Sequence, residues 1–175
     1  MPDKLSFFGG IVAACACVAA VFSAPTLAQQ SRQPKFTSGG IEVIVNRAVP
    51  PGSGSLLVLS LVMTNLADDD VAVVAPDMPM IIADTGGSAT AEKVSGIALS
   101  GCGEAVEHCV VNMGLTPTVI DRHNSIIITM AFRADRNSRV CSVDFSMPLF
   151  IQRAGGGRPT PWRQITVGLP NIRVC

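Results

Sequence analysis

Apolar and polar residues alternate along several stretches of this chain, and a period of two is typical of a β-strand with one buried face. The two clearest stretches have inward-facing candidates Ile126, Ile128, Met130 and Phe132, and Cys141, Val143, Phe145 and Met147. Glycine and proline, 16 and 12 of the 175 residues, interrupt the pattern at short intervals. Because such punctuation excludes long helices, the sequence predicts an all-β sandwich or small barrel.

The predicted strands are short and number seven to nine. They cover residues 41–46, 56–64, 71–75, 80–83, 90–99, 110–113, 125–132, 140–152 and 163–174. A Pro-Pro-Gly-Ser-Gly run separates the first two, which we expect to form a hairpin. No amphipathic helix is predicted outside the N-terminal segment.

The N-terminal 28 residues have the organisation of an export signal. Lys4 precedes an apolar run over residues 5–22, and Thr26-Leu27-Ala28 offers small residues where a signal peptidase cleaves. We therefore expect residues 1–28 to be a signal peptide removed after Ala28. The protein is then periplasmic or secreted, with no membrane span after cleavage.

Two alternatives to this cleavage stay open. The apolar run could remain as an anchor, although it is shorter than the roughly 20 residues that a bilayer requires. Val12-Ala13-Ala14 before Cys15 resembles a bacterial lipoprotein site, which would leave the protein anchored through Cys15.

The rest of the chain is predicted to be one domain behind a linker. Residues 29–40 are small and polar, with Pro34 and a Gly39-Gly40 pair, and we interpret them as flexible. The β-sandwich domain then covers residues 41–175. Its size is close to that of the commonest single domains, so one hydrophobic core suffices.

Charge argues against two classes of partner. The chain has 13 basic and 13 acidic residues, and its densest basic group, Arg133, Arg136 and Arg139, contains Asp135. Binding to nucleic acid or to anionic lipid requires clustered, uncompensated Lys and Arg. We therefore expect no nucleic-acid partner.

Four of the six cysteines lie beyond the predicted signal, namely Cys102, Cys109, Cys141 and Cys175. An even number in an oxidising compartment favours disulfides, and three pairings are open. We favour Cys102 with Cys109, which closes a short loop, and Cys141 with Cys175. A zinc site at Cys102, His108 and Cys109 is the alternative, although the cysteines are spaced too widely for common zinc motifs.

The sequence contains no catalytic pattern. Its two histidines, His108 and His123, lie in a cysteine loop and a turn, and neither Ser100 nor Ser125 has the surroundings of a nucleophile elbow. We therefore predict that the protein is not an enzyme and needs no cofactor.

Copper binding is an alternative function. Met78-Pro79-Met80 places two thioethers on one side of an extended segment, and soft sulfur ligands suit Cu(I) in an exported protein. The arrangement is similar to the methionine and histidine ligands of small periplasmic copper chaperones, with His123 as a further candidate. The competing interpretation is that both methionines fill the core.

Two passages resemble a known family. Residues 59–66 (LSLVMTNL) followed by 71–74 (VAVV), and residues 81–87 (IIADTGG), resemble bacterial extracellular immunoglobulin-like, telokin-like β-sandwich domains. The resemblance covers residues 41–153 and implies an immunoglobulin-like antiparallel sandwich. The chain departs from it at Pro117-Thr118, where such domains carry Pro-Gly, and in the insertion between Cys102 and Cys109.

These features together predict a binding or structural module of the bacterial cell envelope that acts through protein–protein contacts. The partner is an envelope protein whose identity the sequence leaves open. Trp162, the only tryptophan, is a candidate contact residue beside a glycine-rich loop. The alternative is that Trp162 caps one end of the core.

Overall fold

The computed structural model describes residues 33–51, 56–103, 105–133, 140–154 and 159–175. The predicted signal peptide, the alternative anchor and the lipoprotein Cys15 lie outside the described residues. Within the described residues, none of the helical structure is long and apolar enough to span a bilayer.

One sheet, which we call sheet A, contains five antiparallel strands in the order β1-β2-β3-β9-β6. Their bounds are β1 Lys35–Ser38, β2 Ile41–Val49, β3 Leu56–Asn65, β9 Ser125–Arg133 and β6 Ser88–Ser95. The predicted opening hairpin is confirmed, because β2 and β3 pair over almost their whole length. Strand β9 then pairs with the other edge of β3.

The second sheet, sheet B, is built around the long strand β10, Ser142–Arg153. Strand β11 (Arg163–Arg173) pairs with one edge of β10, and β4 (Val71–Ala75) and β5 (Met80–Ala83) share the other edge. Strand β4 also pairs with β8 (Thr118–Ile120) and, in parallel, with β7 (Ala98–Leu99). Because β5 pairs with β6, the two sheets are joined at one corner.

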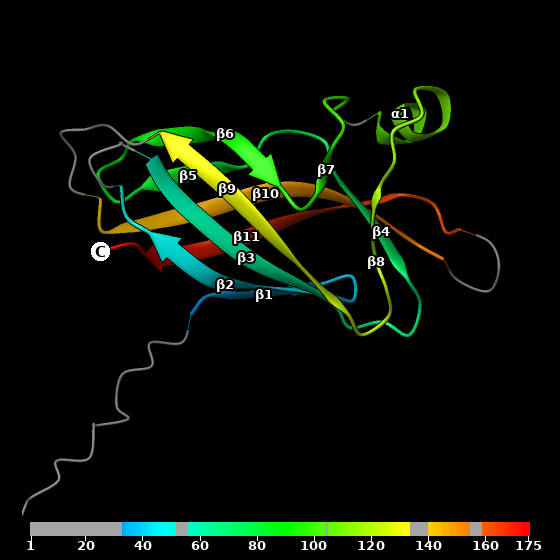
Figure 1. Cartoon of the computed structure of the whole chain (residues 1–175), viewed down its shortest axis with the longest axis horizontal. Helices are drawn as coiled ribbons and strands as arrows, with labels where there is room; N and C mark the ends of the chain where they lie inside the picture. The colour runs from blue at the N-terminus through cyan, green and yellow to red at the C-terminus, as the bar shows by residue number, and fades with distance from the viewer. Residues whose placement is uncertain (1–32, 52–55, 104, 134–139, 155–158) are drawn as a thin grey trace, which may run out of the picture. The chain divides into compact units, whose positions relative to one another are not determined.

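The two sheets pack face to face as an immunoglobulin-like antiparallel β-sandwich, as predicted (Figure 1). Most of the residues that the alternation assigns to the interior lie in a single large cluster between the sheets, but Cys141, directly before β10, is partly exposed and lies outside it. Its fully buried members include Leu57, Leu59, Leu61, Met63, Ile128, Met130, Phe132, Met147 and Leu149. Ile126 is only partly buried at the margin of this cluster, which we call the main core. Burial of one face per strand therefore organises the fold.

The strand count and the linker boundary differ from the prediction. The described residues contain eleven strands, which is more than predicted. The prediction did not separate out β1, β7 and β8, because these strands are too short to show a sequence period. Strand β1 lies inside residues 29–40, so the prediction that this whole segment is a flexible linker is wrong. The Gly39-Gly40 pair forms the two-residue turn of a β1–β2 hairpin, with φ of 60° and 77°. A turn with positive φ at both central residues matches the twist of a hairpin. The two glycines therefore connect β1 to β2 and do not belong to a flexible linker.

The region after β6 also differs from the prediction. The expected strand over residues 90–99 is interrupted at Gly96, whose φ is 88° and where a Cβ would lie 2.1 Å from the Ile127 carbonyl oxygen. Residues 110–113 do not return to the sheet, since they lie in and directly after helix α1, Val106–Asn112. A four-residue segment such as Val-Val-Asn-Met is too short for its period to distinguish a strand from a helix.

Candidate interaction surface

The outward face of sheet A carries an exposed apolar row across three strands. Ile44 of β2 pairs in register with Val62 of β3, which pairs in turn with Ile127 of β9. Ile44 and Ile127 are 36% and 58% exposed, and Val62 is partly exposed. Each side chain alternates with buried neighbours on its strand, so the sheet geometry itself directs the row outward.

Hydroxyl groups flank Val62 and Ile127 along β3 and β9, whereas charged residues of β1 and β2 lie next to the row at its Ile44 end, where Lys35 is in register with Ile44. Ser60 pairs with Thr129 one step along the strands, and the hydroxyls of Thr64 and Ser125 lie 2.8 Å apart on the other side. Hydroxyl groups of this kind form hydrogen bonds without the desolvation cost of a buried charge.

Two ion pairs lie at the sides of the same face. Lys35 of β1 pairs with Glu42 of β2, and Arg133 of β9 donates to Glu92, with 2.5 Å between Nε and Oε1. The hydrogen bond from Arg133 lowers the pKa of Glu92, and the same bond raises the pKa of Arg133. Each pair is internally neutral. Exposed Arg47, in register with Ser60, and exposed Lys93, in register with Ala131, add positive charge to the same sheet.

The structure places the predicted copper ligands in two separate regions. Met78 and Met80 are 42% and 41% exposed on either side of buried Pro79, so neither methionine fills the core. Ile82, two residues further along β5, is also exposed. Both thioethers are therefore accessible, Met78 directly before β5 and Met80 at its first residue.

His123 is not part of this methionine pair. Its Nε2 lies 3.1 Å from Asp68 Oδ1, and the neighbouring Arg122 N–H donates to Asp70, directly before β4. Along β10, Met80 is in register with Ser146, whereas the start of β4 is in register with Arg153. Seven residues of strand correspond to about 23 Å, so His123 cannot share a metal ion with Met78 and Met80.

Trp162 belongs to a small second cluster, which we call the satellite cluster, on the outward face of sheet B. Val74 and Phe150, in register on β4 and β10, form its base, and Val106 of α1 covers them. Partly buried Val110, Leu115 and Trp162 complete it. Trp162, the expected contact residue, is thus partly buried against this cluster and not in the main core, which lies between the two interpretations of an exposed contact residue and a core residue.

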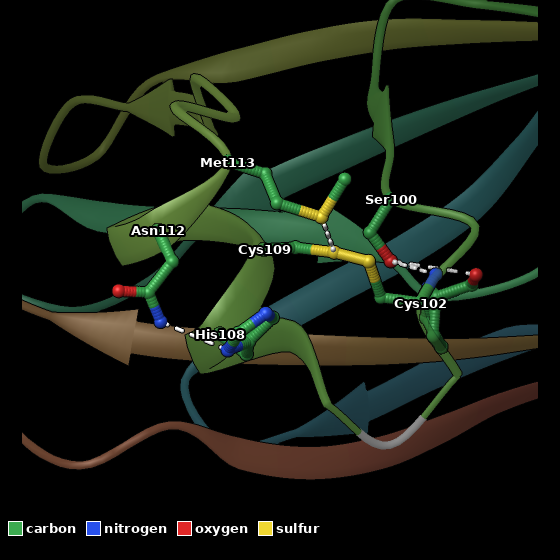
Figure 2. Close-up of a disulfide and its surroundings, with 7 residues drawn as sticks. Ser100, Cys102, His108, Cys109, Asn112 and Met113 are labelled. Carbon is green, nitrogen blue, oxygen red and sulfur yellow. Dashed lines mark hydrogen bonds between the residues drawn. A yellow bond between two sulfur atoms is a disulfide. The ribbon is translucent and has the colours of Figure 1, made fainter.

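The structure pairs the cysteines in the favoured arrangement, Cys102 with Cys109 and Cys141 with Cys175. The first disulfide joins the segment after β7 to the middle of α1 (Figure 2). His108 faces Asn112, with 2.9 Å between Nδ1 and Nδ2. Because both sulfur atoms are in the disulfide, the alternative zinc site has no thiolate ligands in this structure.

Each serine that we considered for nucleophilic chemistry has an ordinary structural partner. Ser100 Oγ accepts a hydrogen bond from the Cys102 N–H and lies 3.4 Å from the Pro76 carbonyl oxygen. Ser125 pairs with Thr64 as described above. Within the described ranges, neither serine is hydrogen-bonded to His108 or His123, so no serine–histidine pair forms there.

Sequence reasoning missed the structural role of Asn65 at the end of β3. Its side chain is fully buried and donates to the carbonyl oxygens of Asp69 (2.8 Å) and Ile120 (3.0 Å), while Oδ1 accepts from the Ala67 N–H (2.9 Å). One amide thereby fixes the β3–β4 loop against the end of β8. A Thr-Asn pair directly before a polar turn was the available signal.

Comparisons with known proteins give distant structural likenesses. The chain is similar to the GAE domain of GGA2p from Saccharomyces cerevisiae, with 11% identity and a TM-score of 0.34 over 80% of this chain and 98% of that one. It is also similar to the human CEP192 ASH/PapD-like domain 7, with 10% identity and a TM-score of 0.30 over 86% of this chain and 98% of that one. No protein-family model and no curated protein matches the chain. The immunoglobulin-like sandwich thus stands on the strand pairing itself, and the bacterial telokin-like resemblance stays a prediction.

Proposed function

We propose that this protein is a non-enzymatic binding module of the bacterial cell envelope, exported by its N-terminal segment and acting through protein–protein contacts. The observation that carries the proposal is the exposed row of Ile44, Val62 and Ile127 on sheet A. The two disulfides support an oxidising compartment.

The chemistry of this row fits a protein partner better than a small polar ligand. The centres of protein interfaces are depleted in charge and enriched in apolar side chains, with polar groups at the rim. Sheet A has this arrangement on β3 and β9, where Ser60, Thr64, Ser125 and Thr129 flank Val62 and Ile127, and charged residues of β1 and β2 form the rim at the Ile44 end. A hydrogen-bonded sheet also presents a rigid surface that loses little conformational entropy on binding.

The test uses one charge placed on each outward face. Ile127→Asp changes the sheet A row, and Ile82→Asp is the matched control because Ile82 is similarly exposed on sheet B. The full-length protein is used to capture partners from an envelope extract of its own bacterium, with captured proteins identified by mass spectrometry. We expect Ile127→Asp to lose a specific protein that wild type and Ile82→Asp retain. Equal capture by all three would contradict the role of sheet A.

The envelope location has its own measurement. Cell fractionation should recover the protein in the periplasmic, secreted or membrane fraction, and its N-terminal residue should show cleavage after Ala28 or lipidation at Cys15. Recovery of an unprocessed chain in the cytoplasm would contradict the export part of the proposal and leave the interaction surface to be judged by the capture experiment.

A second candidate function is Cu(I) binding at Met78 and Met80. It is favoured by one observation, the exposure of both thioethers on either side of Pro79. These two sulfur atoms would hold Cu(I) as soft ligands. The four described cysteines are in disulfides and so would not compete with the methionines for the ion. His123 takes no part, for the register reason given above.

Titration with Cu(I) against a competing chelator tests this second function. The double variant Met78→Leu with Met80→Leu should lose binding, whereas Met113→Leu, which removes another exposed thioether, should retain it. A wild-type protein that fails to compete for Cu(I), or a double variant that binds as well as wild type, would remove copper from consideration.

A further inference from the structure

Residues 105–115, which contain α1, form a segment that is attached to sheet B differently from any strand. Its backbone bonds are local: Ala105 N–H donates to the Cys102 carbonyl, Cys109 N–H donates to Ala105, and the N–H groups of Met113 and Leu115 both donate to the Cys109 carbonyl. Among the described residues, no backbone hydrogen bond joins this segment to a strand of either sheet. It is held by side-chain packing and by the Cys102–Cys109 disulfide (Figure 2).

The helix has little stability of its own. It is seven residues long, no side chain caps its N-terminus, and its last turn has no basic residue. Isolated helices shorter than about 12 residues are marginal in water, because few hydrogen bonds offset the cost of nucleation. The conformation of α1 therefore depends on the contacts of Val106 and Val110 and on the cross-link at Cys109.

The surface beneath α1 is the base of the satellite cluster. Val74 is fully buried and Phe150 is 8% exposed, although both point away from the main core. Trp162, the only tryptophan in the chain, packs against the same cluster. Departure of α1 would therefore uncover a contiguous apolar surface on sheet B without disturbing a strand pair.

We propose that the Cys102–Cys109 disulfide is a redox latch: it keeps α1 on sheet B, and its reduction releases α1 and uncovers Val74, Phe150 and Trp162. The latch is built entirely outside the main core, so both states retain the sandwich. This inference does not depend on which face of the protein binds a partner.

The chemistry requires a dithiol reductant, such as an extracytoplasmic thiol–disulfide oxidoreductase. Cys102 is partly exposed, whereas Cys109 is 2% exposed and has Met113 Sδ 3.7 Å from its sulfur. A reductant thiolate thus attacks Cys102 Sγ, and the Cys109 thiolate leaves and takes up a proton. The second reductant thiol then attacks the mixed disulfide and releases Cys102 as a thiol, so the reductant is oxidised and the protein gains two electrons and two protons.

The first test compares two disulfide-free variants of the full-length protein. Cys102→Ser with Cys109→Ser removes the latch, and Cys141→Ser with Cys175→Ser is the matched control. Without the cross-link, the equilibrium constant for opening of α1 should rise by a factor on the order of 50. Amide exchange in residues 105–115 should therefore accelerate by up to that factor. Trp162 emission should shift to the red in the latch variant, while the far-ultraviolet circular dichroism of the sheets stays unchanged. The control should leave both the exchange of residues 105–115 and the Trp162 emission unchanged.

Two results would overturn the latch. Unchanged exchange and emission in the Cys102→Ser, Cys109→Ser variant would show that packing alone holds α1. Loss of the sheet signal in that variant would show that the disulfide is a staple of the whole fold.

The second test asks whether the disulfide can be reduced in the folded protein. Wild-type protein is treated with a dithiol and then alkylated, and peptide mass spectrometry measures labelling at Cys102 and Cys109. Labelling of both while the sheet signal persists is the expected result. Labelling that appears only when the domain unfolds would overturn the proposal, because the latch could not then open in the native state.

Discussion

The main core and the satellite cluster are both apolar, but they are built in different ways. The main core lies between two sheets whose strands are joined by continuous backbone ladders, and its side chains come from nearly every strand. The satellite cluster has a base on sheet B and a cover, α1, that shares no backbone hydrogen bond with a strand in the described part of the chain. The comparison indicates that global stability resides in the first and that local opening is possible at the second.

The two disulfides follow the same division. Cys141–Cys175 ties the start of β10 to the end of the chain across a separation of 34 residues, and Cys102–Cys109 closes a separation of 7. In the chain-entropy model these loops correspond to about 4 and about 2.5 kcal/mol of destabilisation of the unfolded chain. The longer cross-link therefore acts on global unfolding, whereas the shorter one acts mainly on α1.

The largest expected effect is on the main core. Phe132→Ala should lower the free energy of unfolding by about 3–5 kcal/mol, because the ring is fully buried between the sheets and its removal leaves a cavity. Urea denaturation measures this, with exposed Ile82→Ala expected to change the value by less than about 0.5 kcal/mol. Similar values for the two variants would mean that the main core does not dominate stability.

A smaller effect is expected at Asn65, which fixes the loops at one end of the main core. Asn65→Ala should cost about 2–3 kcal/mol, since it leaves the carbonyls of Asp69 and Ile120 and the Ala67 N–H without their partner. Asn46→Ala is the matched control, because exposed Asn46 makes only a 3.4 Å contact to Ser60. A loss at Asn46 equal to that at Asn65 would refute the argument from buried hydrogen bonds.

The satellite cluster should respond locally. Val106→Ala is expected to lower the global free energy of unfolding by less than about 1 kcal/mol, because α1 can open before the sheets unfold. Amide exchange of residues 105–115 should nevertheless accelerate. Val111→Ala, at a position that is 70% exposed on the same helix, should leave that exchange unchanged. If Val106→Ala destabilises the protein as much as Phe132→Ala, the two clusters form one cooperative unit and the comparison fails.

The smallest effect is electrostatic and depends on pH. Arg133 lowers the folded-state pKa of Glu92, so the ionised carboxylate is favoured in the folded protein. Its contribution is present above the ordinary carboxyl pKa and is lost as the pH falls through the lowered folded value. Wild type should thus be slightly more stable than Glu92→Gln at neutral pH, and the difference between their denaturation curves should shrink as the pH falls below the ordinary carboxyl pKa. A difference that grows on acidification would have the wrong sign.

The strands of the main core could be predicted because their pattern repeats. Ile128, Met130, Phe132, Val143, Phe145 and Met147 were assigned to the interior from alternation alone, and all are buried. The interaction surface was not predicted, since Ile44, Val62 and Ile127 come from three strands and meet only through their register. The exposure of Met78 and Met80 was likewise hidden, because an apolar residue beside a strand is expected in the core more often than at the surface.

By itself, the sequence determined the all-β class and the inward faces of the long strands, because both rest on local periodicity, and short spacing favoured the Cys102–Cys109 pair. Only the tertiary structure decided that Gly39-Gly40 closes a hairpin, that residues 106–112 form a helix and that Asn65 links two loops. The helix and the Asn65 link depend on contacts between residues distant in sequence. A four-residue strand or a seven-residue helix has too little local preference to form without the surface that it covers.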